Sequence, residues 1–162
     1  MQLWRFLHPS ALGFTLKTTT QALIDKIKGA PARPVQAARY VASNARKGDP
    51  EDVLRTLDQF AQQERWLMSV GPKKGPLIKE LAQRLPANAR ILELGAYCGY
   101  SSIMIASAFG PQARITSIEI DRDAVASSRA NVEVAGLSDR ITFVHGPSTQ
   151  MIATLEGHFD LV

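Results

Sequence analysis

The sequence has one cysteine in 162 residues and no long hydrophobic run. A single cysteine, Cys98, excludes an internal disulfide and indicates a reducing compartment, so we expect a cytoplasmic protein. No stretch reaches the roughly 18 consecutive apolar residues of a membrane-spanning helix, and we predict no transmembrane span. With 45% hydrophobic residues the chain has enough apolar material for a core. Collagen-like, disulfide-stapled and disordered proteins are thereby excluded.

Acidic residues are scarce in the first 48 positions, where eight basic residues accompany Asp25 alone. The remainder carries 11 basic and 14 acidic residues, so the excess positive charge belongs to the N-terminal segment. Such a segment can attract nucleic acid or anionic lipid, but its dispersed charges favour a solvated helical face. It lacks the apolar block and cleavage site of a secretory signal. An extra helix is the favoured interpretation, with organelle targeting as the alternative.

Two prolines in the stretch 30–34 interrupt helix formation and mark a boundary. We therefore predict an N-terminal extension over 1–34, helical or mobile, with a weak helical pattern at 16–27. The domain proper is predicted over 35–162. Its first part is helical, with helices at 35–45, from Pro50 onward and at 76–85, because apolar residues recur there at helical spacing. Asp49 is the expected N-cap of the second helix.

From residue 88 onward, short apolar strands alternate with helices, which is the pattern of an α/β fold with a parallel sheet. We predict a doubly wound, Rossmann-like sheet behind the N-terminal helices. The expected strands are 90–94, 114–118, 140–144 and the opening of a fourth at 158–162, and the helices between them are 100–109, 121–135 and 148–155. Because the chain stops inside the fourth strand, we expect a fragment or truncated product of a longer protein.

Ligands of such sheets bind outside the carboxyl ends of the strands. Gly95 and Gly99 bound the turn after the first strand and would allow the backbone to approach a ligand closely. Glu119 ends the second strand, where a carboxylate can accept hydrogen bonds from both hydroxyls of a ribose. Capping of the next helix is the competing role for Glu119. Ile120 is expected to lie against a purine ring.

The turn Gly146-Pro147-Ser148 follows the third strand, where a hydroxyl or amide can address an adenine edge. A helix N-cap is an equally simple explanation of Ser148. A dinucleotide fingerprint would need a third glycine where Ser102 stands. The pattern therefore favours a ligand with ribose and adenine but without phosphate, and S-adenosylmethionine fits that description.

The segment 93–101, which reads ELGAYCGYS, closely resembles the signature of the catechol O-methyltransferase family. The resemblance extends back through ERWLMSVGPKKG at 64–75 and covers about three quarters of the chain. It implies a class I methyltransferase sheet, S-adenosylmethionine as cofactor and a small catechol-type substrate. By position, the resemblance assigns cofactor contacts to Val70, Glu93, Gly95, Tyr97, Ser101, Glu119, Ile120, Gly146, Pro147, Ser148 and Thr149. It assigns the substrate pocket to Trp66, Met68 and Lys74.

The resemblance leaves two parts of the family's machinery unassigned. The family uses a magnesium ion, with ligands that follow the fourth strand, and a catalytic lysine, and we expect no catalytic and no metal-binding residue within this chain. Asp160 lies inside the expected fourth strand and is interpreted as structural. Thr149 departs from the glutamine that the family commonly has, which puts one adenine contact in doubt.

Simpler roles compete with several of these assignments. Cys98 has no histidine partner and is expected to be a packed thiol. Trp66 and Met68 would suit an ordinary core, and Lys74 a solvated turn. His145 ends the third strand, where it is close enough to touch the cofactor pocket.

The leading hypothesis is therefore a catechol-type O-methyltransferase chain that carries the cofactor half and is inactive alone. One alternative is a truncated, non-catalytic module that needs a partner, or a missing C-terminal half, to cover its open sheet. A second is a nucleic-acid methyltransferase that uses the basic N-terminal arm, although the catechol-like segment argues against nucleic acid as a partner.

Overall fold

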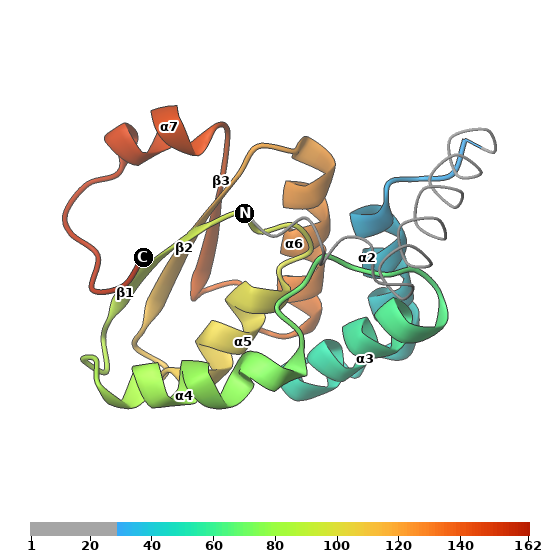
Figure 1. Ribbon diagram of the computed structural model, residues 1–162, viewed down its shortest axis with the longest axis horizontal. Helices are drawn as coiled ribbons and strands as arrows, with labels where there is room; N and C mark the ends of the chain where they lie inside the picture. Colours follow the sequence, from blue (N-terminus) through green and yellow to red (C-terminus); the bar gives the residue numbers. More distant parts are fainter. Residues whose placement is uncertain (1–28) are drawn as a thin grey trace, which may run out of the picture. The chain divides into compact units, whose positions relative to one another are not determined.

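A three-stranded parallel sheet forms the centre of the fold. In the computed structural model its strands are β1 (Arg90–Leu94), β2 (Arg114–Glu119) and β3 (Ile141–His145), in the order β1-β2-β3. Each strand lies within one residue of its predicted bounds. The predicted α/β class with alternating helices and parallel strands is confirmed (Figure 1).

The structure describes residues 29–162, and the sheet and its helices belong to one compact unit, Arg33–Val162. The helix expected at 16–27 and most of the predicted extension 1–34 lie outside the described residues. The boundary at residue 34 stays a prediction.

Helices precede each strand and cover mainly one side of the sheet. Figure 1 shows α5 and α6 together on one side and the short α7 on the other. The helical segments are α2 (Arg33–Asn44), α3 (Pro50–Gln63), η2 (Pro72–Lys74), α4 (Gly75–Gln83), α5 (Tyr100–Ala108), α6 (Arg122–Val134), α7 (Ser148–Met151) and η3 (Ile152–Thr154).

Two of these helices have a side-chain oxygen as their N-cap. Asp49 accepts a hydrogen bond from the Asp52 amide at the start of α3, with Pro50 in the first turn, as predicted. Asp121 accepts one from the Ala124 amide at the start of α6. Each such cap satisfies an amide that the helix itself leaves unpaired, and is typically worth about 1 kcal/mol.

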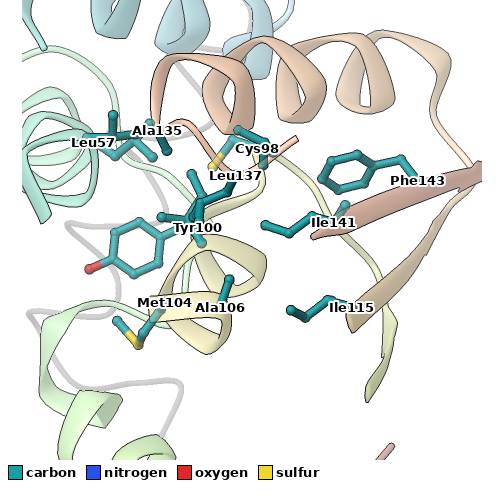
Figure 2. Close-up of a cluster of buried hydrophobic side chains, with 14 of the residues drawn as sticks. Leu57, Cys98, Tyr100, Met104, Ala106, Ile115, Ala135, Leu137, Ile141 and Phe143 are labelled. Atoms are coloured by element: carbon teal, nitrogen blue, oxygen red, sulfur yellow. The ribbon is translucent and has the colours of Figure 1, made fainter. Parts of the chain in front are cut away.

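The core lies between the sheet and α5 and α6. In the parallel register Ile91 is opposite Ile115, and Ile115 is opposite Ile141, so one row of side chains crosses all three strands. Figure 2 shows Ile115, Ile141 and Phe143 on the strands facing the α5 and α6 side of the core. All four of these apolar residues are buried. Full burial of such a side chain stabilises the fold by about 1.5–3 kcal/mol. This row of buried side chains therefore holds the three strands in register, so that their carboxyl ends lie side by side.

The predicted fourth strand is present only as one parallel bridge between Ile91 and Leu161. The Leu92 amide donates to the Leu161 carbonyl at 2.9 Å, on the side of β1 opposite β2. The Asp160 carboxylate accepts from the Arg90 amide at 2.8 Å, so Asp160 has the structural role that we expected. The chain thus returns to the far side of β1 after β3, and the strand order reverses at β1. Ligand sites of open parallel sheets lie at such a reversal.

Candidate functional site

The carboxyl ends of the strands enclose a cavity of about 290 Å³, which we call the strand-end crevice. Six predicted cofactor residues at or after the ends of β2 and β3 meet there with Gly95, which follows β1. The lining residues are Leu94, Gly95, Ile118, Glu119, Ile120, Gly146, Pro147, Ser148 and Thr149. Leu94 and Ile118 were not predicted. The signal that the sequence offered for Leu94 is its position as the last residue of the predicted first strand.

The Glu119 carboxylate is the one charged group in the lining of the crevice, and its side chain is oriented by two backbone amides. Its Oε2 accepts from the Tyr97 amide at 2.8 Å, and its Oε1 accepts from the Asp121 amide at 2.9 Å. Glu119 is 9% exposed. A carboxylate has about four acceptor positions, so two amides leave two for a ligand. The arrangement suits a pair of neighbouring hydroxyl donors.

The competing role for Glu119 belongs to its neighbour. Asp121 is the N-cap of α6, with its side chain on the Ala124 amide. Glu119 bonds to the amide of the cap residue itself and to the turn after β1. The helix is therefore capped without Glu119, whose carboxylate orients the turn and faces the crevice.

Two exposed apolar side chains line the crevice. Ile120 is 66% exposed and Leu94 is 49% exposed. A single exposed leucine or isoleucine is ordinary, but two on one cavity can hold a flat apolar ring. A ring nitrogen of His145, Nε2, lies 3.1 Å from the Ile120 carbonyl oxygen and ties the end of β3 to this residue. His145 itself does not line the cavity.

The turn after β3 forms the third wall of the crevice. Gly146 has φ of +146°, and a Cβ there would come within 2.8 Å of the Met151 side chain, so this position requires glycine. The N-cap of α7 is Pro147, and no side chain bonds there as a cap. Capping does not explain Ser148, which leaves its hydroxyl for the crevice that it lines.

The turn from Gly95 to Gly99 has an unusual backbone. Gly95, Tyr97 and Gly99 all have positive φ, and at +53° Tyr97 is the only described non-glycine residue of this kind. The expected reason for Gly99 was close approach of a ligand. A Cβ on Gly99 would instead come within 3.3 Å of Ser128 on α6, so this glycine serves packing against the helix.

Glu93, predicted to frame the cofactor, does not line the strand-end crevice. Its carboxylate accepts hydrogen bonds from the hydroxyls of Ser102 and Ser117. It also borders a second cavity of about 520 Å³ along the outer edge of β1. We call this cavity the edge groove; it is lined by Ile78, Leu81, Ile91, Leu92, Glu93, Leu94, Ile105, Phe109, Leu161 and Val162.

The remaining predicted cofactor residues also lie outside the crevice lining. Val70 is partly buried against the core, and Ser101 lies in the first turn of α5. Tyr97 belongs to the turn beside the crevice and is half-buried, and burial raises the pKa of its phenol. The cofactor roles of these three residues stay predictions.

The segment from Trp66 to Lys74 lies largely at the surface. Trp66 is 45% exposed and Met68 is 67% exposed, so the alternative that both are ordinary core residues is wrong. Lys74 is exposed at the end of η2, as a solvated turn would have it. None of the three borders the strand-end crevice or the edge groove. Their role in a substrate pocket stays a prediction.

Cys98 is buried, and burial raises the pKa of its thiol to about 11. A thiol with such a pKa is protonated at neutral pH and is a poor nucleophile, in agreement with the packed role expected for it.

Metal-binding and membrane-spanning features are both absent from residues 29–162. No three His, Cys, Asp or Glu side chains gather in that range as a metal site would require. No helix in that part of the chain is long and apolar enough to cross a membrane. Of the eight N-terminal basic residues, four (Arg5, Lys17, Lys26 and Lys28) lie outside the described residues.

A family profile described as "O-methyltransferase" matches residues 44–162. Catechol O-methyltransferase of Bos taurus is 37% identical over 123 residues, covering 76% of this chain and 45% of that protein. Transmembrane O-methyltransferase of Homo sapiens is 34% identical over 127 residues, covering 78% of this chain and 43% of that protein. The chain thus spans about half the length of the curated relatives that it matches.

Solved structures agree on the fold. The O-methyltransferase from Bacillus cereus, in complex with SAH (S-adenosylhomocysteine), is 27% identical with a TM-score of 0.55, over 76% of this chain and 57% of that one. TomG from Streptomyces achromogenes, in complex with SAM (S-adenosylmethionine), is 28% identical with a TM-score of 0.58, over 78% and 58%. The predicted methyltransferase sheet is confirmed by these similarities.

Proposed function

Because this chain belongs to the O-methyltransferase family, we propose that it carries the S-adenosylmethionine site of a catechol-type O-methyltransferase. One observation supports this proposal most: Glu119 is oriented by two backbone amides at the strand ends and retains acceptor positions for two hydroxyls. The cavity beside it has apolar walls for a purine and contains no cluster of cations for a phosphate.

The adenosine end of the cofactor is assigned to the strand-end crevice. Glu119 accepts hydrogen bonds from the two ribose hydroxyls, and charged acceptors make such bonds stronger than neutral ones. Ile120 packs on one face of the adenine. Gly146, Pro147, Ser148 and Thr149 border its edge, with the Ser148 hydroxyl as the polar contact.

The methionine end is assigned to the turn after β1 and the start of α5. Val70 and Ser101 bind the methionine carboxylate, and Tyr97 flanks the cofactor. Gly95 and Glu93 frame this end, Gly95 through its backbone. The hydroxyl bonds of Glu93 suggest that it acts by fixing β1 against α5 rather than by touching the cofactor.

Bound S-adenosylmethionine would supply an electrophilic methyl group on a sulfonium. The protein's contribution is to orient that methyl toward a catechol oxygen, and orientation provides much of the rate in such transfers. Trp66 and Met68 are proposed to wall the catechol pocket, with Lys74 nearby. A cytoplasmic site fits the reduced thiol of Cys98. Magnesium is expected in full-length relatives, but the described residues offer no donor cluster for it, so we derive no step through a metal.

The Glu119 assignment is tested by calorimetric titration of the chain with S-adenosylhomocysteine. Glu119→Ala removes charged hydrogen bonds and is expected to weaken binding by about 1.5–3 kcal/mol. Glu119→Gln keeps the size of the side chain, and its affinity should lie between those of the unaltered chain and Glu119→Ala. Glu133→Ala removes an exposed acid of α6 and serves as the matched control. Unchanged affinity in Glu119→Ala would retire the ribose assignment.

A second candidate, a module that needs a partner for catalysis, is favoured by the edge groove. Among the described residues, the outer edge of β1 bonds only to Asp160 and Leu161, and Val162 beside them is 76% exposed. We propose that the chain binds cofactor but does not methylate catechol until this edge is covered. Incubation with S-adenosylmethionine, catechol and magnesium should give no product above the uncatalysed rate. Multiple turnovers by the purified chain would contradict this.

A further inference from the structure

Asn131 is a fully buried polar residue in the last turn of α6, with 0% of its surface exposed. Its amide Nδ2 donates to the Cys98 carbonyl at 2.9 Å. Its Oδ1 has no hydrogen-bond partner among the described residues. A buried acceptor without a partner costs free energy that an apolar residue of the same size would not. The one bond that Asn131 does make therefore needs an explanation.

That bond ends on the turn between Gly95 and Gly99. Ser128, one helical turn before Asn131, donates from its hydroxyl to the Tyr97 carbonyl at 3.3 Å. Ser128 also packs against Gly99, where an added Cβ would lie 3.3 Å from it. Two consecutive carbonyls of the turn are therefore bound to buried side chains of one helix face. Figure 2 shows Cys98 between α5 and α6, at the place where this contact is made.

The turn needs such support because its backbone is unfavourable. Tyr97 has φ of +53°, a conformation that costs a residue with a side chain roughly 1 kcal/mol or more. Peptide groups are planar, so fixing the Tyr97 and Cys98 carbonyls also fixes the amides that follow them. Those are the amides of Cys98 and Gly99. The Tyr97 amide lies in the preceding peptide group, on the other side of the same residue, and donates to Glu119 at 2.8 Å. The geometry thus links α6, the turn and the crevice carboxylate.

We propose that Asn131, assisted by Ser128, is a positioning residue that holds the 95–99 turn in its cofactor-binding conformation. This inference rests on the proposed function, because it takes the turn to face the methionine end of S-adenosylmethionine. Asn131 acts through the backbone and does not touch the ligand. The conformation of the turn is thereby set before the cofactor arrives, which lowers the entropy cost of binding.

The inference separates the two ends of the ligand. Glu119 keeps a second anchor, the Asp121 amide at 2.9 Å, which does not depend on the turn. Loosening the turn should therefore weaken a ligand with a methionine part more than adenosine alone. If Asn131 had only a structural role, its substitution would lower stability without changing the ratio of the affinities for S-adenosylhomocysteine and adenosine.

The test compares the affinities of S-adenosylhomocysteine and adenosine, measured by calorimetry below the unfolding transition. Asn131→Leu removes the donor and the unpaired acceptor while it keeps the number and branching of the side-chain heavy atoms. The affinity for S-adenosylhomocysteine should fall about tenfold, which is the loss expected when one buried hydrogen bond is removed. The affinity for adenosine should fall less than threefold. Ser127→Ala is the matched control, since Ser127 is buried on the same helix and its hydroxyl bonds, among the described residues, only to the Asp123 carbonyl of that helix. It should leave both affinities unchanged.

Three outcomes overturn the inference: unchanged S-adenosylhomocysteine affinity in Asn131→Leu, equal losses for both ligands, or the same losses in the Ser127 control. If Asn131→Leu does not unfold cooperatively, Ser128→Ala provides the test instead. It should weaken S-adenosylhomocysteine alone by a few-fold, and unchanged binding contradicts the inference. Failure of the unaltered chain to bind either ligand would be a failure of the proposed function instead.

Discussion

The strand-end crevice and the segment from Trp66 to Lys74 differ in what holds them. The crevice is formed by three strand ends whose heights are set by a buried core, and its carboxylate is bonded to two backbone amides. The Trp66–Lys74 segment has no strand; Leu67 anchors it in the core, but the side chains of Trp66 and Met68 are exposed. A site built on a sheet is organised by the fold, whereas a site on a surface segment depends on what packs against it.

The largest expected effect concerns the core beneath the crevice. Ile115 lies on β2 and is 1% exposed, so Ile115→Ala should lower the free energy of unfolding by about 2–5 kcal/mol. Met68→Ala, in the exposed segment, should change it by less than about 0.5 kcal/mol. Urea unfolding measures both variants. Equal losses would mean that the two regions do not differ in packing.

A smaller effect is expected on ligand affinity. Ile120 is 66% exposed in the crevice, and truncation there removes apolar contact with a bound purine. Ile120→Ala should weaken S-adenosylhomocysteine by about 1 kcal/mol with little change in stability. Met68→Ala is the control and should bind S-adenosylhomocysteine as the unaltered chain does, because Met68 is proposed to wall the catechol pocket and does not line the crevice. If Met68→Ala were the weaker binder, the assignment of the two regions would be reversed.

The smallest effect is a pH dependence of stability from Asp58, which accepts from the Tyr100 hydroxyl between α3 and α5 at 3.1 Å. Burial raises the pKa of Asp58 above its ordinary value of 3.8. The folded state therefore favours the protonated acid, and this contribution is lost as pH rises from 3.8 through the higher folded pKa. Asp58→Asn should remove that loss. The free energy of unfolding of the variant, relative to that of the unaltered chain, should therefore rise between about pH 4 and 7. A relative free energy of unfolding that falls over that pH range would contradict the prediction.

Much of this fold was predictable from local patterns. Apolar strands of five or six residues that alternate with helices, and Asp49 before Pro50, carry their signals within a few residues. The position of Glu119 at the end of a parallel strand was predictable from the strand pattern, while its role in ribose binding stays a prediction. These features depend on neighbours in sequence, and the structure has them where expected.

Other features depend on contacts between distant segments. The sequence does not reveal that Glu93 faces Ser102 and Ser117, or that Gly99 is needed by Ser128, because those partners lie 9 to 29 positions away. Asn131 was missed for the same reason: nothing near it indicates that its amide reaches Cys98, 33 residues earlier. The fourth strand was predicted from its composition, but a strand exists only where a neighbour pairs with it, and here one bridge forms.

Binding of an adenosyl ligand to Glu119 in the strand-end crevice is the assignment on which the other proposals depend. Amide nuclear magnetic resonance during titration with S-adenosylhomocysteine observes that binding at the residues concerned. The Tyr97 and Asp121 amides, which both donate to Glu119, are expected to show large shifts that saturate together. Shifts confined to the edge groove around Leu81 and Leu161, with both of these amides unmoved, would contradict the assignment.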